Sequence, residues 1–418
     1  MPMSMDTGMG MGMGMTTDGA AWLSVVGIGE DGLAGLTPSA RLLVDQAQVV
    51  FGGERHLELL PPGSQDRRPW RMPLSSNRDG LAACRGQRVC VLASGDPLWF
   101  GIGSVLIGWF SPDEVTVAPH PGAFSLAAAA MGWALQGCRC LTIHGRPLAA
   151  LALHAYPSAR LLVLSEDAAS PAQVAQLLSS LGFSASRITV LEHLGGPRQR
   201  RLEGTAGDYR HPPGADLNTL AIEVVADGRH HTLSTCPGLP DDAFLHDGQL
   251  TKREVRAATL SALGPWPGAL LWDIGAGSGS VAIEWMRQGG EAVAVERDEA
   301  RLERIARNAL ALGVPGLRIV AGEAPAALVG LPAAPDAVFI GGGATDRRIL
   351  AACWAALRSD GRLVANAVTA EGEAALIDWH HEHGGEMVRL AVSRLAPTGR
   401  FQCWHPLMPI TQYIGTKS

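Results

Sequence analysis

A glycine-rich turn between two short apolar segments, within residues 270–298, constrains the fold of this chain more than any other feature. The first apolar segment, residues 269–272, lies between a Pro/Gly cluster and the glycines, which is typical of a buried strand in a parallel sheet. Asp273 ends this strand, and glycines at alternate positions predict a tight turn whose backbone can approach a ligand closely. A helix at residues 281–287 and a second strand at residues 292–295 are expected to follow. The stretch therefore predicts one unit of an α/β fold.

An acidic residue follows the turn at the spacing of nucleotide-binding folds. Glu296 comes roughly 20 residues after Gly275, where an acid accepts hydrogen bonds from the two hydroxyls of a ribose. The turn differs from the dinucleotide fingerprint, because Gly279 comes one position early and Ser280 stands where the fingerprint has glycine. The pattern therefore does not favour a dinucleotide, whose pyrophosphate needs that fingerprint.

The D-x-G-x-G-x-G pattern of this turn resembles the first motif of the S-adenosylmethionine-dependent methyltransferases with a Rossmann-like sheet. An ordinary glycine-rich turn is the alternative interpretation. The resemblance implies a class I methyltransferase fold, with a doubly wound sheet whose turn receives the amino-acid end of S-adenosylmethionine. The cofactor contacts expected in this half are Thr251, Asp273, Gly275, Ala276, Gly277, Ser278, Gly279, Glu296, Glu323 and Ala324.

Length and composition limit the remaining possibilities. A chain of 418 residues favours two domains, and a net charge of -6 argues against a nucleic-acid binder. Seven cysteines without regular spacing indicate reduced thiols in a cytoplasmic protein, and their pattern predicts no metal site. No apolar run is long enough for a membrane span, and the Gly- and Met-rich residues 1–20 are expected to be a disordered tail rather than a secretory signal.

The first half of the chain alternates apolar strands with helical segments. Strands are expected at residues 22–29, 49–53, 88–93 and 114–118, and Thr37 is a plausible N-cap for the helix that follows the first of them. This alternation predicts an α/β sheet with ligand loops at the carboxyl ends of its strands.

Four motifs of this half, VGIG, SGDPLWFGIG, PGAFS and IHGR, resemble the tetrapyrrole methylases over residues 22–225. The resemblance implies two α/β subdomains with S-adenosylmethionine in the cleft between them, held largely by backbone groups. The cofactor contacts that it implies are Ser94, Gly95, Asp96, Trp99, Phe124 and Ser125, with residues 164–165 and 192–194 as further contributors. Arg146 is the expected substrate contact, because a guanidinium can pair with a carboxylate through two hydrogen bonds.

One loop departs from this family's pattern. The family commonly has G-x-G-P-G-D, whereas here GIG is followed by Glu30, Asp31 and Gly32, so we assign no role to Asp31. A domain kept only as a scaffold is the alternative interpretation of this half. His193, like the other histidines at strand ends, is interpreted as a hydrogen-bonded structural residue.

The second half carries motifs on both sides of the glycine turn. The segment LTKREVRA predicts an amphipathic helix with Thr251 as N-cap and Glu254 completing a capping box. With FIGGG and LVANAVT, these motifs resemble the decarboxylating corrin methyltransferase domain over residues 237–413. The methyl acceptor is expected at the end of the fourth strand, with cations for its carboxylates, although solvated charged residues are the alternative for each cation. The substrate contacts expected here are Lys252, Arg253, Gly341, Gly342 and Arg347.

Together the two resemblances imply a tetrapyrrole methylase domain at residues 21–227, a linker at 228–240 and a class I methyltransferase domain at 241–418. They imply that the first domain methylates precorrin-6B at C5, and that the second methylates C15 and removes the ring C acetate carboxyl, giving precorrin-8 in cobalamin biosynthesis. Both families form homo-oligomers, which we expect here as well. Another tetrapyrrole, an RNA, or a non-enzymatic cofactor sensor are the alternatives. No catalytic residue is assigned, because proximity and orientation supply most of what such a transfer needs.

Overall fold

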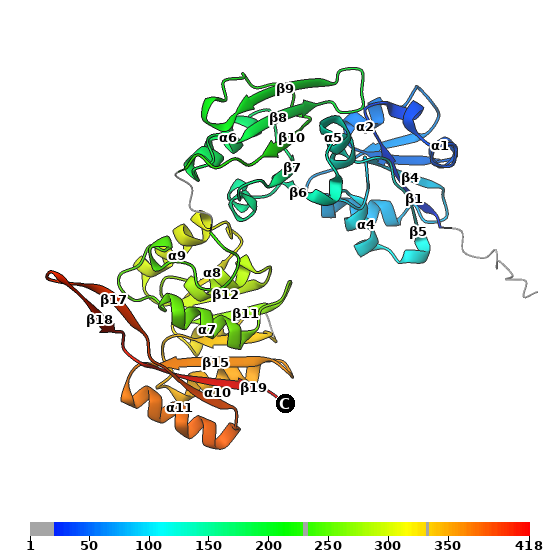
Figure 1. Cartoon of the computed structure of the whole chain (residues 1–418). Coiled ribbons are helices and arrows are strands. Elements are labelled where there is room, and N and C mark those ends of the chain that lie inside the picture. Colours follow the sequence, from blue (N-terminus) through cyan, green and yellow to red (C-terminus); the bar gives the residue numbers. More distant parts are fainter. Residues whose placement is uncertain (1–20, 229–232, 332–333) are drawn as a thin grey trace, which may run out of the picture.

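Three large sheets and one two-stranded sheet follow one another along residues 21–228, 233–331 and 334–418, which are the residues that this computed structural model describes. Two large sheets belong to the first half of the chain, and the third belongs to the second half (Figure 1). The tail expected at residues 1–20 lies outside the described residues. No helix within the described part of the chain has the length and apolar character needed to cross a membrane.

The first sheet is parallel throughout, with strand order β3-β2-β4-β1-β5. Its strands are β1 (Leu23–Ile28), β2 (Val49–Gly52), β3 (Asp66–Pro69), β4 (Val89–Ser94) and β5 (Val115–Ala118), connected by α1 (Pro38–Asp45), α2 (Glu54–Glu58), α3 (Arg78–Ala82) and α4 (Gly103–Trp109). The central strands are apolar along their length because helices cover both faces of the sheet. Thr37 caps α1 as predicted, since its Oγ1 accepts a hydrogen bond from Ala40 N at 3.2 Å.

The second sheet is mixed, with strand order β6-β7-β10-β8-β9. Strands β6 (Cys138–Thr142) and β7 (Arg160–Leu164) are parallel, whereas β8 (Arg187–Glu192), β9 (Arg200–Thr205) and β10 (Asn218–Glu223) make antiparallel pairs. Helices α5 (Ala123–Met131) and α6 (Ser170–Ser180) pack on it. The first half thus has the two α/β subdomains that its motifs predict.

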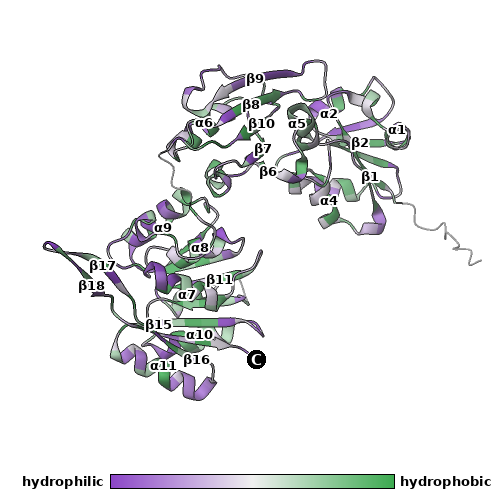
Figure 2. Cartoon of the chain, viewed as in Figure 1, coloured by the Kyte–Doolittle hydropathy of each residue, from purple (hydrophilic) through white to green (hydrophobic). Residues whose placement is uncertain are grey.

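The third sheet is doubly wound, as predicted, with strand order β13-β12-β11-β14-β15-β19-β16. Its parallel strands are β11 (Leu270–Ile274), β12 (Glu291–Glu296), β13 (Arg318–Ala321), β14 (Ala337–Ile340) and β15 (Arg362–Ala367), and β19 (Ile410–Thr416) runs antiparallel between β15 and β16 (Glu386–Leu390). The helices of this half are α7 (Arg253–Leu263), α8 (Ser280–Arg287), α9 (Glu299–Ala311), α10 (Arg347–Ala356) and α11 (Ala370–His383). Neighbouring residues of β11 point to opposite faces, so that Leu271 and Trp272 lie in different apolar clusters. Figure 2 shows β15 as strongly apolar and α11 as largely polar.

Two local predictions are wrong. Helix α7 begins at Arg253, and its N-cap is Lys252 rather than Thr251, because the Thr251 carbonyl is turned toward the Arg256 guanidinium. Glu254 closes no capping box and instead accepts a hydrogen bond from Arg394 at 2.6 Å. The C-terminal strands divide into two groups. Strands β16 and β19 extend the main sheet, while β17 (Ser393–Thr398) and β18 (Phe401–Pro406) form a separate two-stranded arm (Figure 1).

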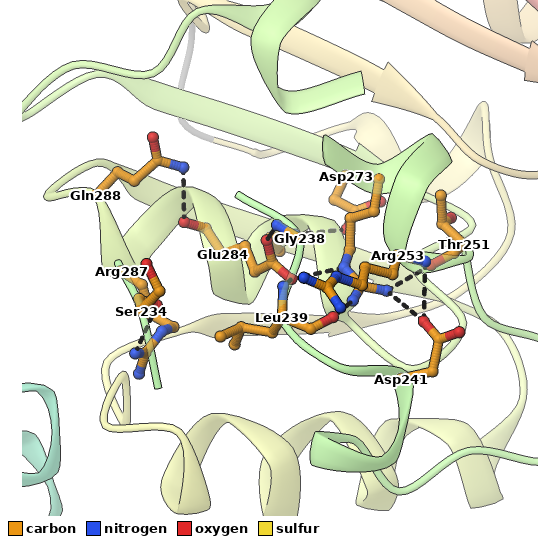
Figure 3. Close-up of polar contacts among 12 residues, drawn as sticks. Ser234, Gly238, Leu239, Asp241, Thr251, Arg253, Asp273, Glu284, Arg287 and Gln288 are labelled. Carbon is orange, nitrogen blue, oxygen red and sulfur yellow. Dashed lines mark hydrogen bonds and ion pairs between the residues drawn. The ribbon is translucent and has the colours of Figure 1, made fainter. Parts of the chain in front are cut away.

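A buried ion pair fixes the chain segment that enters the second half. Arg256 is 0% exposed, and its Nε donates to Oε1 of Glu284, which is 2% exposed, at 2.6 Å. The same carboxylate accepts hydrogen bonds from the backbone N–H groups of Gly238 at 2.6 Å and Leu239 at 3.0 Å (Figure 3). The guanidinium in turn donates to the carbonyls of Leu239 and Thr251. Because both charged groups also bind backbone groups of this segment, the pair ties residues 238–251 to α7 and α8.

Replacing Arg256 by methionine is expected to cost about 3–5 kcal/mol of unfolding free energy, because the Glu284 carboxylate would remain buried without its cation. Chemical denaturation of the full chain measures this loss. Arg307→Met is the matched control, since that side chain is 71% exposed, and it should change stability by less than about 0.5 kcal/mol. Equal denaturation midpoints for wild type and Arg256→Met would contradict the importance of the pair.

Candidate active sites

Loops at the carboxyl ends of the five parallel strands of the third sheet enclose a cavity of about 880 Å³. This is the edge at which open α/β sheets bind ligands. Most of the residues predicted for this half line the cavity. They are Thr251, Lys252, Gly275, Ala276, Gly277, Ser278, Glu296, Glu323, Ala324, Gly341 and Gly342.

The turn after β11 approaches its neighbour backbone to backbone. Gly275, Gly277 and Gly279 have φ values of 70°, 61° and 75°, in the left-handed region that glycine adopts without strain. A Cβ atom on Gly275 would lie 3.0 Å from Gly342 N and 3.1 Å from Gly342 Cα, so no side chain fits between the two loops. Ser278 Oγ is buried and has no hydrogen-bond partner among the described residues. The turn thus lines the cavity mainly with main-chain groups, and it holds one buried hydroxyl without a partner in the described part of the chain.

Glu296 lies at the end of β12, as predicted, and holds the turn in place. Its Oε2 accepts a hydrogen bond from Gly277 N at 2.8 Å, and its Oε1 accepts from Arg297 N at 2.9 Å and Asp298 N at 3.0 Å. The side chain lines the cavity although the residue is only 5% exposed. Because each carboxylate oxygen has two lone pairs, Glu296 keeps acceptor capacity for a ribose hydroxyl. Its predicted role toward the cofactor therefore fits the geometry.

Asp273 and Gly279 lie beneath the turn instead of in the cavity wall. Asp273 Oδ2 accepts a hydrogen bond from Ala282 N at 3.0 Å, whereas Oδ1 has no partner within the described part of the chain. Burial raises the pKa of Asp273 to about 7, against the effect of that hydrogen bond, and the nearby Glu296 charge raises it further. A Cβ on Gly279 would lie 2.9 Å from Ile305 Cγ2 on α9, so this glycine serves helix packing.

Two predicted cations lie away from the described cavity lining. Arg253 uses its backbone N–H to bind Asp241 Oδ1 at 2.9 Å, and the Arg347 guanidinium pairs with Glu382 on α11. Asn366 was not predicted as a site residue, yet it lines the cavity and accepts a hydrogen bond from Gln412 at 2.9 Å. Met408, beside the β17–β18 arm, was missed as well. Both depend on the pairing of β15 with β19, which no local motif reveals.

The first half contains a second cavity, of about 1100 Å³, between its two subdomains. Its lining comes from strand ends of both sheets, as the family resemblance implies. The main cofactor and substrate residues predicted for this half line it, namely Ser94, Gly95, Asp96, Trp99, Phe124, Ser125 and Arg146, together with Leu164, Ser165, His193 and Leu194. Glu192, the remaining predicted contributor, lies outside the described lining and pairs with Arg200 instead.

Strand β1 and two loops also meet through their backbones at this cavity. A Cβ on Gly27 would lie 1.9 Å from Gly95 O, and a Cβ on Gly95 would lie 2.7 Å from Gly122 Cα. The aromatic rings of Trp99 and Phe124 lie beside this junction, with centroids 5.3 Å apart. Glycine, backbone and aromatic faces thus form a cradle that fits a flat, polar cofactor held mainly by main-chain groups.

Polar side chains at the rim of this cavity include several that sequence reasoning missed. Arg55 and His56, from α2, both line it and both contact Ser94 Oγ, at 3.0 Å and 2.9 Å. Arg146 lies with its guanidinium 5.1 Å from the ring centre of Phe100. The segment of α2 has no motif and no apolar period, so its proximity to the SGDP loop is visible only in the fold.

Comparison with known proteins places these two sites in a class. Residues 23–209 match the family of tetrapyrrole (corrin/porphyrin) methylases, and residues 242–417 match the precorrin methyltransferase domain. The fold and the two sites thus define a methyltransferase with two unlike domains in one chain. A relative from Sinorhizobium sp, a precorrin-6Y C(5,15)-methyltransferase [decarboxylating], is 48% identical over 403 residues, 95% of this chain and 96% of the relative. The chain belongs to the family of decarboxylating precorrin-6Y C(5,15)-methyltransferases.

Relatives named for one activity alone match smaller parts of the chain. A cobalt-precorrin-7 C(5)-methyltransferase from Salmonella typhimurium is 29% identical over 43% of this chain and 88% of its own length. A protein from Saccharolobus solfataricus, named "Probable cobalt-precorrin-6B C(15)-methyltransferase (decarboxylating)", is 34% identical over 32% of this chain and 71% of its own length. The two activities in this family's name therefore also occur in separate, shorter proteins.

Substituting Glu296 by alanine is expected to weaken S-adenosylmethionine binding in the second half about 10- to 100-fold, the equivalent of a charge-assisted hydrogen bond of about 1.5–3 kcal/mol. Glu296→Gln, which keeps an acceptor oxygen but not the charge, should lose less. Calorimetric titration measures both affinities, with Glu303→Gln on the exposed face of α9 as the control. Unchanged affinity in a folded Glu296→Ala variant would exclude the ribose contact.

Asp273 makes the stability of the second half depend on pH. Its pKa is higher in the folded chain, at about 7, than its ordinary value of 3.8, so the folded state retains a proton that the unfolded state releases. The stabilisation is full below pH 3.8 and is lost as pH rises toward 7. Thermal unfolding of wild type and Asp273→Asn should therefore show the variant gaining stability relative to wild type across this window. A difference independent of pH would contradict the raised pKa.

Proposed function

We propose that the chain methylates precorrin-6B at C5 and C15 with S-adenosylmethionine and decarboxylates the ring C acetate, giving precorrin-8 in cobalamin biosynthesis. One observation carries this proposal. Two cavities of about 880 and 1100 Å³ lie at the strand ends of two unlike methyltransferase folds, and each is lined by the motif residues of its own family. Two methyl transfers at different carbons can each use one of these cavities.

The first domain is assigned the C5 methylation, and the second is assigned the C15 methylation and the decarboxylation. The family match of residues 242–417 to the precorrin methyltransferase domain supports this division, as does the existence of shorter relatives named for C5 or C15 alone. We place the domains at residues 21–227 and 241–418, with the linker at 228–240 between them.

The residues that line the cavity of the second half suit an acidic tetrapyrrole. S-adenosylmethionine supplies an electrophilic methyl group, so the main task of the chain is to hold the acceptor carbon in line and exclude water. Lys252 lines the cavity and has no acidic partner within ion-pair distance in the described part of the chain. Arg297 and Arg301 also line it, but they pair with Glu323 and Asp247. Of the three cations predicted to bind substrate in this half, Lys252 is therefore the one best placed to bind a carboxylate.

The test is incubation of the full chain with precorrin-6B and S-adenosylmethionine, followed by mass spectrometry. Wild type should add two methyl groups and lose one carbon dioxide. Gly95→Ala should abolish only the C5 methylation, and Gly275→Ala only the C15 methylation and decarboxylation, because each added Cβ would meet backbone atoms within 3.0 Å. Gly80→Ala and Gly316→Ala are matched controls, since nothing lies within 4 Å of an added Cβ at either position.

Two results would contradict the assignment. Loss of both methylations from either variant, in a protein that remains folded, would mean that the two cavities do not work independently. Addition of a single methyl group by the wild-type chain would remove one of the two proposed activities.

A further inference from the structure

A carboxylate and a histidine from different subdomains meet at the cavity of the first half. Glu30 follows β1, and His193 follows β8, and both line the cavity. The distance from His193 Nδ1 to Glu30 Oε2 is 3.0 Å, and both side chains are largely buried. The approach is close enough that a Cβ on Gly196, in the same loop as His193, would lie 2.5 Å from Glu30 Cβ. The loop that departs from the family's pattern therefore ends in a specific contact across the cleft.

The backbone at His193 is held in a conformation that few side chains adopt. Its φ is 47°, in the left-handed region, where residues other than glycine are uncommon. Hydrogen bonds from His193 N to Leu217 O at 3.1 Å and from Gly196 N to His193 O at 3.0 Å fix this conformation. Such strain is concentrated at functional sites, where it sets the direction of a side chain.

The charge of Glu30 determines which ring nitrogen of His193 carries the proton. Burial raises the pKa of Glu30, but the His193 hydrogen bond and the Arg55 charge outweigh it, so the pKa lies below its ordinary value. An ionised carboxylate can only accept, so Nδ1 is the donor of the contact. In the neutral ring Nε2 then carries the lone pair, and it has no hydrogen-bond partner among the described residues. This is the arrangement of a carboxylate-oriented general base.

We propose that His193, oriented by Glu30, accepts the proton released in the first domain's methylation. The inference rests on the proposed function. As the new carbon–methyl bond forms with an electron pair of the tetrapyrrole, the sulfur–methyl pair stays on sulfur, and the ring system becomes cationic. It returns to neutrality when the methylated carbon, or a ring nitrogen conjugated with it, loses one proton. Nε2 takes this proton, and Glu30 stabilises the imidazolium that results.

Three other histidines line this cavity, and each has a different set of contacts. His56 Nε2 lies 3.0 Å from an Arg55 nitrogen, which can only donate, so its lone pair is already used, and burial lowers its pKa to about 4. The His144 side chain is 71% exposed to water. His120 is the main alternative base. Its Nε2 lies 3.7 Å from Asp31, and its Nδ1 lies 3.2 Å from the Pro121 carbonyl.

Other charges around the pair shape its pH dependence. Arg55 and Arg198 share the Glu30 carboxylate with His193, from α2 and from the loop after β8, and both oppose a cationic imidazole. Glu192 lies next to His193 in the chain and favours a cation, although its own carboxylate pairs with Arg200 at 2.6 Å. The pH profile of the C5 transfer should therefore change on substitution of Glu30 by glutamine as well as on substitution of His193.

The first experiment uses the full chain, precorrin-6B and S-adenosylmethionine with a ¹³C-labelled methyl group, so that NMR separates the methyl signals at C5 and C15. His193→Asn keeps a residue that tolerates positive φ and removes the base. It should lower kcat for the C5 transfer about 100-fold or more and leave the KM for S-adenosylmethionine and the C15 transfer unchanged. Added imidazole should restore part of the C5 rate in His193→Gly, which a purely structural role would not allow.

Controls separate this proposal from its alternatives. His211→Gln changes a histidine of the same subdomain outside the described cavity lining, and it should leave both rates unchanged. A wild-type C5 rate and pH profile in His193→Asn would overturn the proposal, as would a loss of the C5 transfer in His120→Asn alone. A wild-type chain that transfers no methyl to C5 would instead overturn the proposed function, and this proposal with it.

A second measurement needs neither substrate nor cofactor. ¹⁵N NMR of the histidine-labelled chain reports which ring nitrogen of His193 is protonated, with His193→Asn identifying the signal. The Nδ1-protonated form is expected in wild type and should lose its predominance in Glu30→Ala. A proton on Nε2 in the neutral wild-type ring would overturn the proposal whatever the activity.

Discussion

The close approach of backbone loops at the ends of parallel strands is the constraint on which both cavities depend. In the second half the turn after β11 meets the loop after β14, and in the first half the loop after β4 meets the loop before α5. Glycine is needed at each meeting point because a Cβ would collide with backbone, which cannot rotate away as a side chain can. Each cavity wall is therefore built largely of main-chain groups whose positions are set by the sheets, and a small change in a loop would move the whole wall.

Buried carboxylates are stabilised by different kinds of partner in the two halves. In the second half Glu296 accepts hydrogen bonds from three backbone N–H groups, one in the turn after β11 and two in the residues that follow Glu296 itself. Asp273 accepts only one such hydrogen bond, and burial raises its pKa. In the first half Glu30 is held by side chains from α2 and from the loop after β8. Glu296 is therefore fixed by the backbone around it. Glu30 keeps its contact with His193 only while the two subdomains stay together.

Sequence reasoning located β1, β2, β4, β5, β11 and β12, the glycine turns and the acid at the end of β12, because short apolar runs and glycines indicate local structure without reference to distant residues. It missed β3, whose DRRP sequence lacks an apolar pattern, and it misplaced the cap of α7, where the Thr251 carbonyl serves the buried Arg256. The contacts of Glu30 could not be predicted from the sequence for another reason. His193 and Arg55 are distant in the chain, and only the packing of two subdomains brings all three together.

The hydrogen bonds at the entrance to the second half also shorten the tether between the domains. Asp227 N is bound to the Gly182 carbonyl of the first half, and the Leu233 and Ser234 carbonyls accept from Arg287 of the second half at 3.1 Å and 3.2 Å. The six peptide steps from Asp227 to Leu233 span at most roughly 20 Å. A short tether keeps the two halves near each other, so a ligand that binds both halves at once would meet the second one at an effective concentration in the millimolar range.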